Sequence, residues 1–153
     1  MIIKEDKPKT RKVGNLEHKL QAEMVKDFQE TYPGRIGALV ATFQETRNPI
    51  VGGIMKSMGL VRGVSDLLYF PGDGCVIAIE VKHLDMYHDV EHLTEQCMWL
   101  RKFPTCGRFC HDREDFKVII ATSGNGGGVS PWRVLEKLKR TDKKKIKWAD
   151  LVD

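Results

Sequence analysis

Apolar side chains recur at every fourth position near the start of the chain, at Leu16, Leu20, Met24 and Phe28. One face of an α-helix repeats with nearly this period, so the pattern predicts an amphipathic helix of about four turns that begins near Asn15. Tyr32-Pro33-Gly34 should end it, because proline and glycine interrupt helices.

Three segments have the short apolar runs that are typical of β-strands: residues 36–43, 66–70 and 75–82. The last two flank the turn sequence Pro71-Gly72-Asp73-Gly74, which predicts a hairpin. The second hairpin strand is apolar on both faces as far as Ile79. A strand of that composition belongs in the middle of a sheet, with its charged residues at its C-terminal end.

The remaining pattern is less uniform. Residues 44–63 are irregular, and residues 86–103 have helical spacing. Residues 116–122 are predicted to form a third buried strand, and a glycine-rich connection then leads to a helix that begins at Ser130-Pro131 and runs to about Arg140. Strands mixed with helices predict a single α/β domain with a mixed central sheet flanked by helices.

Composition supports one globular domain. The 153 residues are 41% hydrophobic and 30% charged. The chain has no apolar run long enough for a membrane span and no signal-peptide pattern, so a cytoplasmic protein is expected. The predicted organisation is a flexible basic arm (residues 1–14), a folded domain (15–140) and a basic C-terminal tail (141–153).

Charge is distributed unevenly along the chain. Residues 1–12 carry a net charge of +3 and residues 133–147 one of +6, whereas residues 13–132 carry −3. Basic ends around an acidic centre suit a protein that holds a polyanion and performs metal chemistry on it. Two solvated tails explain the charge equally well.

The hairpin gathers two carboxylates and a lysine. If Phe70 faces Cys75, then Asp66 lies opposite Ile79 and next to Glu80. Side chains alternate along a strand, so Glu80 and Lys82 share a face. Carboxylates are suitable Mg²⁺ ligands, and a nearby lysine can orient or activate an attacking water. A surface Glu–Lys pair with an unrelated aspartate is the alternative interpretation.

Several segments, in order, resemble the VRR-NUC domain of the PD-(D/E)XK nuclease superfamily, and the resemblance covers residues 15–122. They are Glu17-His18-Lys19-Leu20-Gln21, Asn48, Met55-Lys56-Ser57-Met58-Gly59-Leu60, Arg62-Gly63-Val64-Ser65-Asp66-Leu67-Leu68, Ile79-Glu80-Val81-Lys82 and Gln96. Ser65 stands where the family usually has proline, and the acidic segment from His83 to Glu95 is longer than the family's loop.

The resemblance implies roles for individual residues. The metal ligands would be Asp66, Glu80 and the carbonyl of Val81, with Lys82 orienting the water. Glu17 would hold a metal-bound water or a second ion, and Gln96 would complete the catalytic set. Favourable charge at a helix N-terminus is the alternative role for Glu17. Residues expected to contact nucleic acid are Gln21, Asn48, Lys56, Arg62, Lys143, Lys144 and Lys145.

His83, His88 and His92 follow the Glu-x-Lys strand closely. They could form a second metal site, but a solvated helix face is the favoured interpretation.

The predicted function is a Mg²⁺- or Mn²⁺-dependent endonuclease that cuts DNA. The resemblance implies selectivity for branched structures such as Holliday junctions, a homodimer, and a bacterial cell or phage-infected host. A DNA-binding protein with an inactive nuclease-like fold and a sequence-specific restriction-type nuclease are the alternatives.

Overall fold

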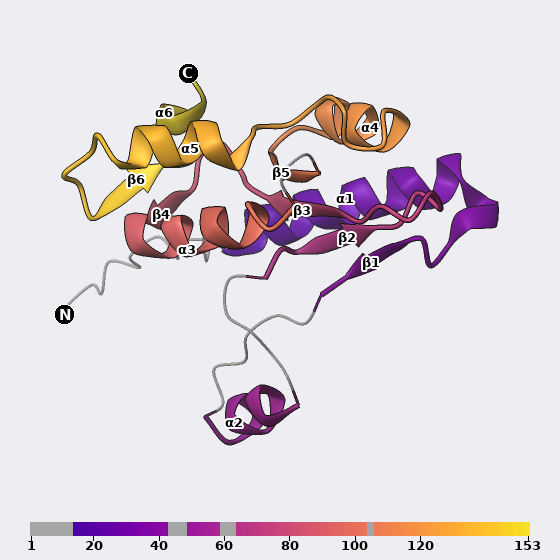
Figure 1. Cartoon of the computed structure of the whole chain (residues 1–153), viewed down its shortest axis with the longest axis horizontal. Helices are drawn as coiled ribbons and strands as arrows, with labels where there is room; N and C mark the ends of the chain where they lie inside the picture. The colour runs from indigo at the N-terminus through magenta and orange to yellow at the C-terminus, as the bar shows by residue number, and fades with distance from the viewer. Residues whose placement is uncertain (1–13, 43–48, 59–63, 104–105) are drawn as a thin grey trace, which may run out of the picture.

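A computed structural model describes residues 14–42, 49–58, 64–103 and 106–153. Its centre is a four-stranded sheet in the order β1 (Leu39–Ala41), β2 (Leu67–Tyr69), β3 (Ile77–Val81) and β5 (Gly107–Cys110). The first two pairings are antiparallel, and β3 pairs with β5 in parallel. The predicted single α/β domain with a mixed sheet and helices is therefore confirmed (Figure 1).

Helices cover both faces of the sheet (Figure 1). On one face, α1 (Gly14–Thr31) and α4 (Arg113–Ala121) pack against the odd-numbered side chains of β3, such as Ile77 and Ile79. On the other, α3 (Val90–Leu100) and α5 (Pro131–Leu138) pack around Ala78. Side chains alternate along a strand, so Glu80 and Lys82 lie on the same face as Ala78, toward α3.

The first helix is confirmed. It ends at Thr31, and a 3₁₀ turn, η1 (Pro33–Arg35), follows it. The predicted strand over residues 36–43 is confirmed only at its centre, as β1. A short helix, α2 (Pro49–Ser57), lies in the stretch that was expected to be irregular, apart from the sheet (Figure 1).

The hairpin is confirmed, but its expected register is wrong by one residue. Leu67 pairs with Ile79, and Tyr69 pairs with Ile77. Continuing this register places Asp66 directly opposite Glu80, not opposite Ile79. The turn therefore has one residue more than expected, and both of its glycines, Gly72 and Gly74, have positive φ. The shift brings the two carboxylates closer than the sequence alone suggested.

The predicted strand over residues 116–122 is wrong, because residues 116–121 belong to helix α4 and Thr122 is its C-cap. Phe116, Ile119 and Ile120 are buried at helical spacing, whereas Val118 is 43% exposed. The helix begins after Asp112, whose carboxylate accepts the backbone N–H groups of residues 114 and 115 at 2.7 and 3.2 Å. The remaining strand of the sheet is instead β5, which the sequence analysis did not identify.

The helix predicted over residues 86–103 is shorter than expected. Residues Tyr87–Asp89 form strand β4, and α3 begins at Val90 and ends at Leu100. The predicted start of the last long helix is confirmed, because the Ser130 side chain accepts the backbone N–H of Trp132. This helix ends at Leu138, two residues before its predicted end near Arg140.

The C-terminal segment is not a tail. Strand β6 (Lys145–Lys147) pairs with β4, and helix α6 (Trp148–Val152) follows it. The side chains of Trp148 and Leu151 are fully buried. Trp148 packs against Phe109 with ring centroids 5.0 Å apart. Residues 145–153 therefore complete the core on the α3–α5 side of the sheet. None of the described helices combines the length and apolarity that crossing a bilayer requires.

Candidate active site

Buried charge is concentrated at the C-terminal end of strand β3. Glu80 is 3% exposed and Lys82 is 2% exposed, although both carry ionisable groups. They lie in the middle of the sheet, between β2 and β5. Burying charged groups is costly unless they are paired, and even a buried pair stabilises a fold less than apolar residues of similar size do, so stability alone does not explain the charges at this end of the strand.

Asp66 adds a second carboxylate from the neighbouring strand. Its Oδ2 accepts the backbone N–H of Val81 at 2.8 Å, which fixes the aspartate beside β3. Its carboxyl group also lies close enough to that of Glu80 for each to shift the pKa of the other. Like charges directly opposite each other destabilise a sheet, so this pair of carboxyl groups favours a proton or a cation beside it.

Two further side chains hold Glu80 in place. Lys82 Nζ lies 3.6 Å from Glu80 Oε1. From helix α3, the amide of Gln96 donates to the same oxygen at 2.8 Å. Gln96 is itself only 5% exposed. One carboxylate oxygen of Glu80 is therefore held by a cation and an amide donor.

Glu17 reaches the cluster from the first turn of α1. Its Oε1 accepts the backbone N–H of His83 at 3.3 Å and lies 2.8 Å from His88 Nε2. The side chain of Glu17 is 16% exposed, so it is more accessible than Glu80. Glu17 therefore stands at the entrance of the cluster, held by the segment that follows β3.

Burial and charge move the carboxyl pKa values in opposite directions. Burial raises the pKa of Glu80 well above its usual value; Lys82 opposes this shift and Asp66 reinforces it. Burial also raises the pKa of Asp66. Burial acts in the same direction on Glu17, but the polar contact with His88 and the charge of Lys82 outweigh it, so the pKa of Glu17 is lowered. Such separation of neighbouring pKa values is common where side chains do chemistry.

The cluster contains oxygens that suit a hard cation. Glu80 Oε2 and Gln96 Oε1 are both buried, and neither has a hydrogen-bond partner among the described residues. Carboxylate and amide oxygens are ligands of Mg²⁺ and Ca²⁺. The described side chains do not form a ready-made group of three His, Cys, Asp or Glu ligands. Magnesium needs only one or two carboxylates when water and phosphate oxygens complete its coordination, so the residues fit the ion.

The structure brings together five of the predicted residues: Glu17, Asp66, Glu80, Lys82 and Gln96. Val81 lies between Glu80 and Lys82, and the proposed ligand role of its carbonyl stays a prediction. Gln21 is partly buried on α1, one turn beyond Glu17.

The other predicted contacts with nucleic acid are dispersed. Lys56 is exposed on α2, which does not belong to the cluster. Lys143, Lys144 and Lys145 are exposed at and just before β6. Asn48 and Arg62 lie outside the described residues.

His88 joins the cluster, contrary to the expected solvated helix face, whereas His92 lies on α3 at the edge of the cluster with its side chain 41% exposed. His88 is on β4, and its side chain is 10% exposed against Glu17. His92 Nε2 lies 3.3 Å from Gln96 Nε2. No local signal identifies His88, because its burial depends on β4 pairing with a strand almost 60 residues later. The i,i+4 spacing of His92 and Gln96 on α3 was the one available clue.

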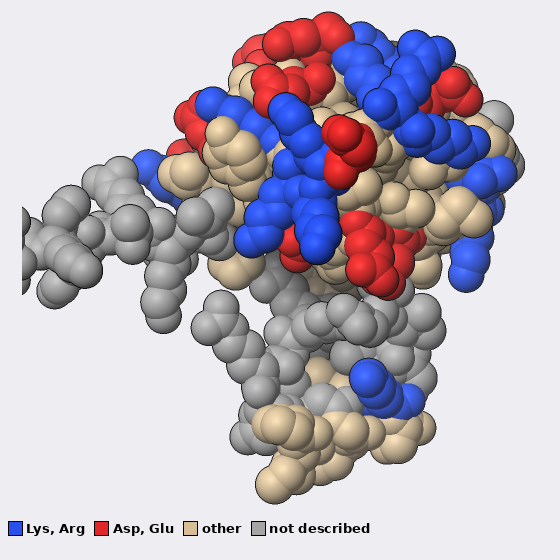
Figure 2. Space-filling view, turned by 90° about the vertical axis from the view of Figure 1, so that its left-hand side faces the viewer, with Lys and Arg blue, Asp and Glu red and all other residues tan. Residues whose placement is uncertain are grey.

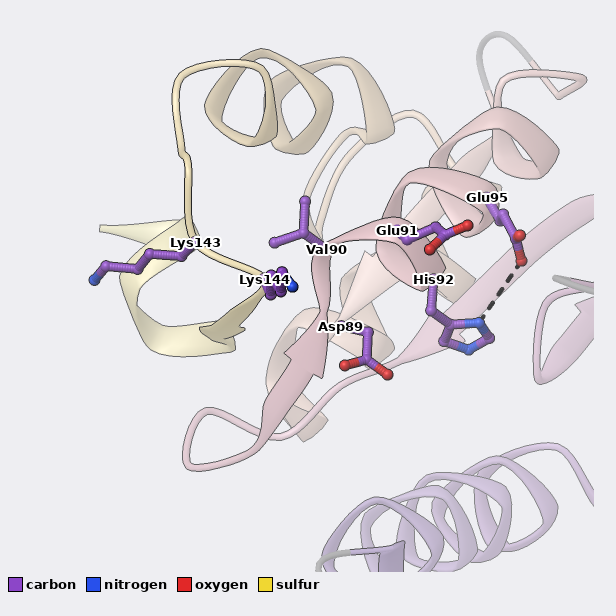
Figure 3. Close-up of a pocket in the computed structure, with 7 residues that line it drawn as sticks. All are labelled: Asp89, Val90, Glu91, His92, Glu95, Lys143 and Lys144. Atoms are coloured by element: carbon purple, nitrogen blue, oxygen red, sulfur yellow. Dashed lines mark ion pairs between the residues drawn. The ribbon is translucent and has the colours of Figure 1, made fainter.

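A groove of about 780 Å³ lies beside the cluster (Figure 3). Its lining residues are Asp89, Val90, Glu91, His92, Glu95, Lys143 and Lys144. His92 connects this groove to Gln96 and so to Glu80. On this side of the molecule, lysine and arginine side chains gather in ridges with acidic side chains between them (Figure 2).

Comparisons with models of protein families, with curated proteins and with solved structures each found no match to this chain.

Proposed function

We propose that this protein is a Mg²⁺- or Mn²⁺-dependent endonuclease that hydrolyses phosphodiester bonds in DNA, with a PD-(D/E)XK core of the VRR-NUC type. The observation that supports this most is the burial of Glu80 and Lys82 at the end of one central strand, with the partly buried Asp66 bonded beside them. A fold gains nothing in stability from such a cluster, so chemistry is the better explanation for it.

Each residue has a role in this chemistry. Asp66 and Glu80 would hold the ion, joined by the Val81 carbonyl, and Glu17 would hold a metal-bound water or a second ion. A bound divalent ion lowers the pKa of a coordinated water and offsets charge on the reacting phosphate. Lys82 would orient the attacking water.

Gln96 keeps Glu80 Oε1 engaged, at 2.8 Å. The other oxygen of Glu80, which lacks a partner among the described residues, then remains available for the ion.

DNA is the proposed partner because exposed lysines lie beside the groove that leads to Gln96. Lys143 and Lys144 line one side of it (Figure 3). Contacts of this kind position a phosphate backbone without reading its sequence. Selectivity for branched DNA, and a homodimer that presents two sites to two strands, remain proposals that derive from the family resemblance.

An inactive DNA-binding protein and a restriction-type nuclease are the competing functions. The complete Asp66, Glu80 and Lys82 set argues against the first, because a protein that only binds DNA does not need buried carboxylates. The second requires direct readout of bases, for which the described residues offer no separate recognition domain.

One assay tests the proposal. Purified protein is incubated with Mg²⁺ or Mn²⁺ and matched duplex, single-stranded, flap and four-way junction substrates, with Asp66→Ala, Glu80→Ala and Lys82→Ala run beside it. The wild type should cut a branched substrate fastest, whereas each variant should bind DNA without cutting it.

Glu136→Ala is the matched control, because Glu136 is an exposed glutamate on α5. It should cut like the wild type. Cleavage by Glu80→Ala at the wild-type rate would overturn the assignment of the site. Cleavage of one duplex sequence alone would favour the restriction-type alternative, and binding without any cutting would favour the inactive one.

A further inference from the structure

The position of Glu17 depends on a histidine that neither the hairpin nor α1 supplies. Glu17 Oε1 lies 2.8 Å from His88 Nε2. That nitrogen is buried, and none of its neighbours among the described residues, Glu17 included, meets the geometry of a hydrogen bond. The 2.8 Å approach to Glu17 is therefore a close polar contact, and no other group competes for Nε2 in this part of the chain.

Strand β4 holds His88 through its pairing with β6. His88 pairs with Ile146 at the centre of a three-residue register. Backbone hydrogen bonds extend this pairing at both ends, from Val90 N–H to the carbonyl of Lys144 at 2.9 Å and from Trp148 N–H to the carbonyl of Met86 at 2.9 Å. The C-terminal segment therefore determines the position of β4.

That segment is in turn fixed by the core. Trp148 and Leu151 are fully buried. The indole N–H of Trp148 donates to His111 Nδ1 at 3.1 Å. A continuous set of contacts thus runs from the hydrophobic core through β6 and β4 to the carboxylate of Glu17.

We infer that His88 is a positioning residue: held by β6, it orients the carboxylate of Glu17 toward the divalent ion, so that the C-terminal segment is part of the active site. The inference rests on the proposed function. Residues that orient metal ligands in this way affect metal affinity or activity by about 10- to 100-fold when they are removed.

The test measures Mn²⁺ binding by calorimetry on metal-free protein, and single-turnover cleavage of the four-way junction beside it. His88→Ala should weaken Mn²⁺ binding by about 10-fold or more and slow cleavage by a similar factor, with the KM for DNA little changed. His88→Gln should recover most of the Mn²⁺ affinity and most of the cleavage rate, because the amide Nε2 of glutamine can donate to Glu17 from nearly the same place. His18→Ala, on the exposed side of Glu17, should match the wild type.

A double-mutant cycle separates positioning from general support of the fold. If His88 acts through Glu17, then adding His88→Ala to Glu17→Gln should change Mn²⁺ affinity less than about twofold. If the losses of Mn²⁺ affinity in the two single variants simply add in the double variant, the inference is overturned. Urea unfolding of each variant checks that the folded fraction is the same.

The outcomes distinguish the two claims. If His88→Ala binds Mn²⁺ as tightly as the wild type, the positioning role is overturned. The nuclease function is unaffected by that result, provided that the wild type cuts DNA. If Mn²⁺ binding depends on His88 but the wild type cuts no substrate, the positioning role is supported and the proposed nuclease function is overturned. A wild type that neither binds Mn²⁺ nor cuts DNA overturns both.

Discussion

The two ends of strand β3 are equally buried and chemically opposite. Ile77, Ala78 and Ile79 have no exposed surface and pack into the apolar clusters on both faces of the sheet. Glu80 and Lys82, one and three residues beyond Ile79, are buried almost as completely. The first end gains stability from burial, and the second loses it.

The comparison of the two ends shows which part of β3 is not optimised for stability. If Glu80 and Lys82 served only structure, apolar residues of similar size would serve it better. Ion pairs elsewhere on the molecule are placed differently, since Arg113 meets Asp27 between α4 and α1 with its side chain 47% exposed. Among the residues that the structure describes, the buried charged side chains are those at the end of β3, which is why we place the chemistry there.

The largest expected effect comes from removing both charges at the Glu80–Lys82 end of β3. The double variant Glu80→Gln, Lys82→Met should reduce cleavage by at least about 10³-fold, in the range seen when central catalytic groups are removed. Its free energy of unfolding should be unchanged or higher by about 1–4 kcal/mol, because a buried ion pair has been replaced. Urea unfolding and single-turnover cleavage of one protein preparation measure the two quantities. Loss of stability by several kcal/mol would show that the pair is structural.

At the apolar end of β3, we expect a loss of stability with little change in cleavage. Ile77→Ala should lower the free energy of unfolding by about 2–5 kcal/mol, because it leaves a cavity between the sheet and its helices. Cleavage per folded molecule should change less than about threefold. A large drop in cleavage at full folding would mean that the two ends of the strand are not independent.

The exposed lysines before and in β6 should affect binding and not chemistry. Replacing Lys143, Lys144 and Lys145 with alanine should weaken binding to all DNA about equally. If all three contact phosphates, it should also flatten the slope of log affinity against log salt by about two to three units. Cleavage at saturating protein should stay close to the wild-type rate. An unchanged slope would place the DNA elsewhere on the surface.

The smallest effects are two opposite pH dependences, measured on metal-free protein. The pKa of Glu80 is raised, chiefly by burial, so the folded state holds the extra proton. The associated stability is present at low pH and is lost as pH rises through the raised pKa. The pKa of Asp27 is lowered by its hydrogen bond with Arg113, so its stability is present near neutral pH and is lost as pH falls through the lowered pKa.

Comparing the wild type with Glu80→Gln and with Asp27→Asn over a pH series of urea unfolding curves isolates each contribution. The two difference curves should slope in opposite directions. Curves of the same sign would mean that Glu80 is ionised in the free protein.

Sequence reasoning reached the hairpin because its signals are local: two apolar runs around a Pro-Gly turn, and a Glu-x-Lys on one face. It failed for α4, because the run Phe116 to Ala121 is short and apolar enough to suit a strand, and only the Asp112 cap favoured a helix. It also failed for β5 and β6, which have three or four residues each and depend on pairing with distant strands.

The residues of the candidate site show the same contrast between local signals and long-range pairing. Asp66, Glu80 and Lys82 come from one hairpin, so spacing alone could gather them. Glu17 and Gln96 were reached only through the family resemblance. His88 was named only as part of a possible second metal site, and its position against Glu17 could not be predicted, because that position depends on the pairing of β4 with β6.

The claim that the buried end of β3 is a metal-dependent hydrolytic site is tested most directly by single-turnover cleavage of a four-way junction in Mg²⁺, in Ca²⁺ and in excess chelator. We predict cutting in Mg²⁺, binding with little cutting in Ca²⁺, whose looser coordination places water and phosphate poorly, and no cutting in chelator. Full cleavage in excess chelator would contradict the claim.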